Sequence, residues 1–215
     1  MFKKTILLVT VFSLLLLCAC SPKNKTKPNA HDYFELEDGY NEVYVKAADL
    51  YNTFLNGNSS AFDIQTEKDV PIDKFIKSGS GEGANQYVLF DINVDGSPEL
   101  HFTGSTYAIF TIQDDRVLLV YSEPLKFEFH QLLSTPGIMA MQRSQGVTYR
   151  FVTLSKDNTV SITEFTDPRD TGTNLPFTFN GKTVTEEDWK FFTKPYFNQT
   201  KDTVAIPWNN YAKHH

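Results

Sequence analysis

Residues with oxygen-bearing side chains occupy alternate positions in one short segment of the chain. Residues 87–100 read YVLFDINVDGSPEL, in which Asp91, Asn93, Asp95, Ser97 and Glu99 stand at relative positions one, three, five, seven and nine. Hard cations such as Ca²⁺ take six to eight oxygen ligands, which a curled loop of this kind can supply. We therefore predict a calcium site made by these side chains, with the backbone carbonyl of Ser97 as a neutral ligand.

The glycine at position six, Gly96, would permit the sharp turn that such a loop needs. The segment resembles the D-x-[DN]-x-D-G calcium loops, but Phe102 replaces the bidentate glutamate that an EF-hand carries at position twelve. Because strands are expected on both sides, it is more similar to the calcium loops of integrin-type propeller blades. The alternative is an acidic, solvated hairpin turn that binds no ion. If calcium binds, its expected role is to stiffen the loop.

The first twenty residues have the organisation of a secretory signal. Lys3 and Lys4 precede a mostly apolar run over 5–17, which is short for a bilayer span of about 20 residues. Residues 17–20, LCAC, resemble the bacterial lipobox. This resemblance implies cleavage after residue 19 and a thioether-linked diacylglyceryl group, with fatty acids such as palmitate, on Cys20. The alternatives are a plain signal peptide and a retained anchor helix.

These features predict three parts of the chain: a lipoprotein signal peptide (1–19), a lipidated cysteine with a flexible tether (20–32), and a single globular domain (33–215). The tether is polar and contains two prolines, Pro22 and Pro28. We expect the domain to be anchored to the cell membrane by lipid and to face the extracytoplasmic side. Cleavage would remove Cys18, so the mature chain could form no internal disulfide.

The composition limits the classes of partner. The 215 residues are 40% hydrophobic and 14% aromatic, with a formal net charge of −6. These values exclude a disordered polyelectrolyte and a polytopic membrane protein, and they argue against a nucleic-acid partner. Beyond the membrane itself, the expected partners are a cell-wall glycan or another envelope protein.

The hydrophobic periodicity predicts an α+β fold, in which a mainly antiparallel β-meander is accompanied by an N-terminal amphipathic helix and a short C-terminal helix. A stripe of apolar residues at helical spacing covers 40–55, and Asn180-Gly181 predicts a hairpin followed by a helix from Thr185. Residues 58–84 are expected to form a connector with a short helix near 72–76. Strands are expected near 86–91, 99–103, 106–112, 116–122, 137–143, 147–154, 159–165 and 204–208.

No standard catalytic motif is present in the sequence. His101 and His130 fall in strand-like segments, and a triad assembled only by the fold stays open. We therefore expect a binding or structural module without enzymatic activity, of unknown ligand. The alternatives are an envelope hydrolase and a transporter-associated lipoprotein. Trp189, Phe191 and Phe192 are expected to pack onto the sheet.

The segment from Tyr87 to Val117 also carries a family resemblance. The pattern consists of a strand, the motif DI-x-x-DG-x-PEL, an aromatic strand and an acidic turn. It resembles the corresponding segment in a group of uncharacterised lipoproteins from Gram-positive (Firmicutes-type) gut bacteria. Those chains also begin with a lipobox and an amphipathic helix. The resemblance implies an envelope location and a similar fold, and it implies no activity.

Overall fold

The computed structural model describes residues 42–78, 85–124, 129–133, 137–144, 146–169 and 175–212. The predicted signal peptide, Cys20 and the tether lie outside the described residues. Neither of the two helices in these ranges has the length and hydropathy needed to cross a membrane.

The first sheet has the strand order β13-β3-β4-β5-β6-β1-β2. All of its neighbouring strands are antiparallel except β1 and β6, which are parallel. A short 3₁₀ helix, η1 (Ile72–Lys74), follows β2. The strands are β1 (Ala61–Asp63), β2 (Lys68–Val70), β3 (Gln86–Phe90), β4 (Glu99–Thr103), β5 (Thr106–Gln113), β6 (Arg116–Pro124) and β13 (Asn209–Asn210).

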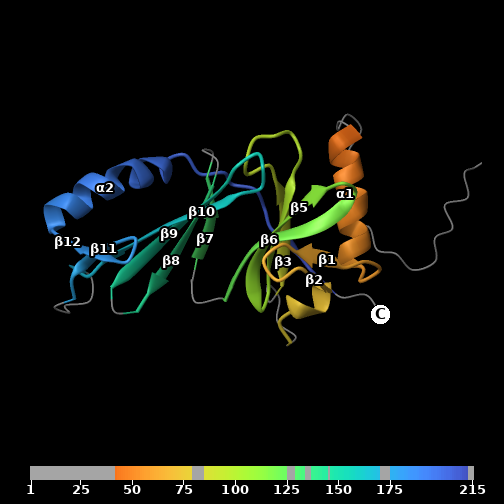
Figure 1. Cartoon of the computed structure of the whole chain (residues 1–215), viewed down its shortest axis with the longest axis horizontal. Coiled ribbons are helices and arrows are strands. Elements are labelled where there is room, and N and C mark those ends of the chain that lie inside the picture. The colour runs from red at the N-terminus through yellow and green to blue at the C-terminus, as the bar shows by residue number, and fades with distance from the viewer. Residues whose placement is uncertain are drawn as a thin grey trace, which may run out of the picture. The chain divides into compact units, whose positions relative to one another are not determined.

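Helix α1 (Glu42–Leu55) packs against this first sheet (Figure 1). Its apolar stripe buries Tyr51 and Phe54 completely, and the ring centroid of Phe54 lies 4.9 Å from that of Phe110 on β5. The Tyr51 hydroxyl donates to the carbonyls of Pro98 and Phe110, each at 3.0 Å. The helix is therefore fixed to the sheet by a hydrophobic core and by a buried tyrosine.

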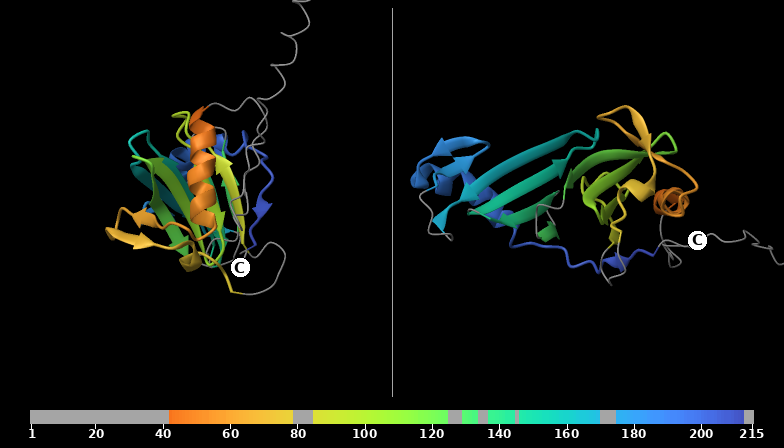
Figure 2. Two further views of the ribbon diagram at one scale, coloured as in Figure 1. Left: turned by 90° about the vertical axis from the view of Figure 1, so that its right-hand side faces the viewer. Right: turned by 90° about the horizontal axis from the view of Figure 1, so that it is seen from below.

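The second sheet is antiparallel throughout, with the order β12-β11-β10-β9-β8-β7. Helix α2 (Glu186–Gln199) lies along it, and the further views agree (Figure 2). Trp189, buried to 3% exposure, joins the aromatic cluster beneath the helix. The strands are β7 (Phe129–Leu132), β8 (Ile138–Arg143), β9 (Val147–Leu154), β10 (Val160–Asp167), β11 (Phe177–Phe179) and β12 (Lys182–Val184).

A second hydrophobic cluster joins the two sheets. Ile109 and Val120 of the first sheet share it with Ile138 and Val152 of the second, and all four side chains are buried. This burial provides the main apolar stabilisation between the sheets.

The predicted α+β class, with mainly antiparallel sheets and two helices, agrees with the structure. Strands β3, β4, β5, β6, β8, β9 and β10 lie within two residues of the predicted ranges at each end. At the predicted hairpin, Asn180 and Gly181 both have positive φ, as a type I′ turn requires. The Thr185 hydroxyl caps α2 by accepting from the Asp188 N–H at 3.1 Å.

Three parts of the prediction were wrong. The connector contains strands β1 and β2, whose three-residue lengths leave no readable alternation. The segment 204–208 is not a strand, and pairing with β3 is confined to Asn209 and Asn210. Phe191 is 75% exposed, because α2 turns its Trp189 side toward the sheet, whereas Phe192, although 40% exposed, still contacts the sheet, with its ring centroid 5.3 Å from that of Phe179 on β11.

Candidate functional site

The predicted calcium loop connects β3 to β4 and is closed by its own side chains. The Asp91 carboxylate accepts the N–H groups of Asp95 at 3.1 Å and Gly96 at 2.9 Å. The Asn93 side-chain oxygen accepts the Asp95 N–H at 3.0 Å, and Asp95 accepts the Ser97 N–H at 2.8 Å. The alternating polar residues thus curl the backbone around themselves, as a cation loop requires.

Two residues of the loop have positive φ, Gly96 at 93° and Val94 at 55°. Positive φ is rare for a β-branched residue and costs free energy. Val94 is also 59% exposed, so no burial of its side chain offsets that cost. The loop therefore holds its curled shape against the local preference of its own sequence.

Glu99 is the most unusual residue of the predicted set, because its side chain is completely buried. Its two carboxylate oxygens accept the Ile92 N–H at 2.9 Å and the Thr111 hydroxyl at 3.4 Å. Burial raises the pKa of Glu99 to about 8, against the hydrogen bond from Ile92, and the charges of Asp95 and Asp91 add to the rise. The site accumulates negative charge that a proton or a cation would neutralise.

The surroundings tie this loop to other elements. The Asn93 amide donates to Asp95 at 3.0 Å and to the carbonyl of Ser155, which follows β9, at 3.5 Å. Ile92 is completely buried in the cluster between the two sheets. The Tyr51 hydroxyl of α1 reaches the Pro98 carbonyl. Any ligand that stiffens the loop would therefore stiffen contacts with α1 and with the second sheet.

The residue types at this site are ones that bind calcium. The arrangement of their side chains fits an ion less well. Within the described ranges, no group of three or more His, Cys, Asp and Glu side chains is placed to hold a metal ion. Calcium also accepts amide and backbone carbonyl oxygens, which Asn93 and Ser97 can offer. A carboxylate oxygen that accepts one hydrogen bond keeps a second lone pair for an ion.

His101 and His130 contact a tyrosine and a glutamate through the hydrogen bonds that the described residues show. His101 is completely buried, with its Nδ1 2.8 Å from the Tyr107 hydroxyl. Burial lowers the pKa of His101 to about 3, so the imidazole is neutral. The His130 Nε2 lies 2.9 Å from a Glu123 oxygen, and its ring stacks on Tyr107 with centroids 4.0 Å apart.

A buried ionic network joins the sheets, and sequence reasoning missed it. Glu123 on β6, 3% exposed, pairs with Arg150 on β9 at 2.5 Å, and Arg150 also pairs with Glu164 on β10 at 2.5 Å. Burial alone would raise the pKa of Glu123, but the hydrogen bond from His130 and the charge of Arg150 hold that pKa below its ordinary value. The sequence signal that could have revealed this network is a charged residue inside a mostly apolar strand, Glu123 in β6 and Arg150 in β9.

Comparisons of the chain with protein-family models, with curated proteins and with solved structures each find no match. The account of function therefore rests on the residues and their geometry.

Proposed function

We propose that the protein is a membrane-anchored extracytoplasmic lipoprotein whose domain is a binding or structural module stiffened by calcium at residues 91–99. The observation that carries the calcium part is the buried Glu99 carboxylate, which shares its loop with Asp91 and Asp95. A divalent cation replaces the proton that this carboxylate otherwise retains, and it neutralises the Asp91 and Asp95 carboxylates at the same time.

In this proposal calcium has a structural role. The ligands are Asp91, Asn93, Asp95, the Ser97 carbonyl and Glu99. Their own hydrogen bonds already close the loop, so the ion adds stability to a formed turn. Because Ile92 and Pro98 contact the core and α1, the gain extends beyond the loop to the domain.

The anchor is proposed from the lipobox at residues 17–20. A single-chain acyl anchor binds membranes only marginally, whereas two acyl chains on one residue hold a protein stably. The acidic domain is repelled by anionic lipid, so the diacylglyceryl group on Cys20 supplies the membrane attachment.

Replacing Cys20 with Ala tests the anchor. We expect the variant to be released from membranes or to remain unprocessed, because it lacks the thiol that the lipid modifies. Membrane fractionation, with mass measurement of the processed chain, follows the change. Cys18→Ala is the matched control and should fractionate as the unmodified sequence does. A Cys20→Ala protein that is processed and still sediments with membranes would contradict the anchor.

A further inference from the structure

An open pocket of about 470 Å³ lies between α2 and the second sheet. Pockets of 300–1,000 Å³ are the size that small-molecule ligands occupy. Aromatic residues from two elements contribute to its lining, Tyr149 of β9 and both Trp189 and Phe197 of α2. The polar lining residues are Asp167, Arg169, Lys190, Thr193, Lys194, Asn198 and Lys201.

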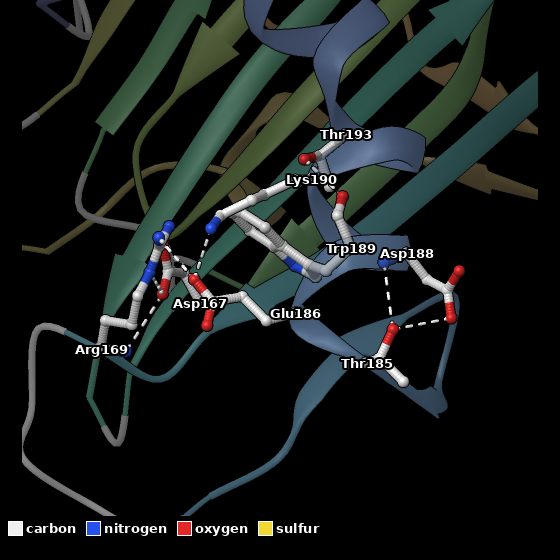
Figure 3. Close-up of polar contacts among 8 residues, drawn as sticks. All are labelled: Asp167, Arg169, Thr185, Glu186, Asp188, Trp189, Lys190 and Thr193. Carbon is white, nitrogen blue, oxygen red and sulfur yellow. Dashed lines mark hydrogen bonds and ion pairs between the residues drawn. The ribbon is translucent and has the colours of Figure 1, made fainter.

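Four of the charged groups around the pocket neutralise one another. Arg169 pairs with Asp167 at 2.5 Å and with Glu186 at 3.4 Å, and Glu186 pairs with Lys190 at 2.7 Å. Figure 3 shows these side chains meeting between the end of β10 and the first turns of α2. Hydrogen bonds from Arg169 lower the pKa of Asp167, and those from Lys190 lower the pKa of Glu186, so both carboxylates are ionised.

Two further lysines remain as surplus positive charge. Among the described residues, neither Lys194 nor Lys201 makes an ion pair with a carboxylate, and the Lys201 ammonium donates only to the neutral Asn198 side chain, at 3.0 Å. The protein as a whole is acidic, with a net charge of −6. A local excess of two cations beside a pocket in an acidic protein indicates an anionic ligand.

The aromatic lining adds a second requirement. Tyr149 and Phe197 are partly exposed, and their rings meet edge to face with centroids 5.0 Å apart. Trp189 is buried, and its indole N–H has no acceptor among the described residues. A buried donor without an acceptor is costly. A ligand with an apolar ring face and an anionic group meets the requirements of the aromatic lining and of the two lysines.

We infer that this pocket binds an acidic sugar. Its carboxylate or phosphate group pairs with Lys194 and Lys201, and its ring C–H face packs on Tyr149 and Phe197. This inference rests on the binding-module part of the proposed function and supplies its ligand class. It does not depend on calcium at residues 91–99 or on the anchor.

The protein contains two tryptophans, and Trp208 lies in the cluster between the sheets. A Trp208→Phe background therefore makes Trp189 the only indole reporter. The full chain in this background is titrated with trigalacturonate, glucuronate and glucose 6-phosphate, with maltotriose and inorganic phosphate as neutral and ring-free comparisons. Every titration is run once with calcium and once with chelator.

We expect a saturable change of Trp189 emission with at least one acidic sugar, and at least tenfold weaker binding of maltotriose and of phosphate. A Lys194→Glu/Lys201→Glu variant should lose tenfold or more in affinity. A charge-matched Lys156→Glu/Lys182→Glu variant, altered at exposed lysines outside the pocket lining, should bind unchanged. Circular dichroism and the melting temperature verify that both variants are folded.

Three results would overturn the inference. They are the absence of saturable binding by all three acidic sugars, equal binding of phosphate alone, and an equal loss in the two charge-reversal variants. If sugar binding persists in chelator while calcium binding at residues 91–99 fails, the pocket stands and the calcium proposal falls. If calcium binds and no acidic sugar does, the pocket inference alone is wrong.

Discussion

Without calcium, the free energy of unfolding is expected to fall by about 2 kcal/mol between pH 6.5 and pH 8 because of Glu99 alone. Its pKa is about 8 in the folded protein against an ordinary value of 4.5, so the folded state retains a proton that the unfolded chain releases. This stabilisation is complete below pH 4.5 and is lost as the pH rises through 8. Denaturant unfolding in chelator measures the slope.

The chosen pH window avoids an opposing contribution from His101. Its pKa is lowered to about 3 by burial, so its effect on stability rises with pH most steeply below the unfolded pKa of about 6.5 and levels off above it. Glu99→Gln removes the titrating group and should abolish most of the slope. Glu67→Gln, at an exposed acid in another turn, should keep it. Equal slopes in the Glu99 variant and the unmodified protein would contradict the raised pKa.

Replacing Arg150 with Ala is expected to destabilise the domain by about 2–4 kcal/mol. The change leaves Glu123, which is 3% exposed, buried without its guanidinium partner and with His130 as its remaining basic contact. We place the value below that of a fully buried pair because the Arg150 side chain is 25% exposed. Chemical denaturation at pH 7 gives the free energy of unfolding.

Two variants separate the buried ion pair from other effects of losing Arg150. Glu164→Gln removes the partner that is 41% exposed and should cost at most about 1 kcal/mol. Glu123→Gln combined with Arg150→Met removes both charges and should recover a large part of the loss. If the double variant is as unstable as Arg150→Ala, the loss comes from packing and not from a Glu123 carboxylate left without Arg150.

Strands β3, β4, β5, β6, β8, β9 and β10 could be predicted because each has alternating or continuous apolar residues between clear turns. Asn180-Gly181 and Thr185 specified a hairpin and a helix start through local backbone chemistry. The two-residue strand β13 and the parallel pairing of β1 with β6 depend on long-range contacts. No local pattern carries that information.

The candidate loop was found from the spacing of its oxygen-bearing side chains, because its ligands are close in sequence. Complete burial of Glu99 was not predictable, since it depends on Thr111 of β5 and on the packing of Ile92. The pocket between α2 and the second sheet is lined by residues of separate elements, which lie between positions 149 and 201 in the sequence. Phe191 was assigned to the wrong face because successive residues of a helix point in different directions, so that Phe191 cannot face the sheet together with Phe192.

Thermal unfolding in millimolar calcium and in chelator tests whether the loop at residues 91–99 binds calcium. At a hundred times the dissociation constant, calcium would add about 2.7 kcal/mol and raise the melting temperature by about 5–10 °C. The shift should vanish in Asp91→Ala and persist in Asp49→Ala, which removes an exposed carboxylate of α1. An unmodified protein with the same melting temperature in calcium and in chelator would contradict the claim and leave residues 91–99 as an acidic turn.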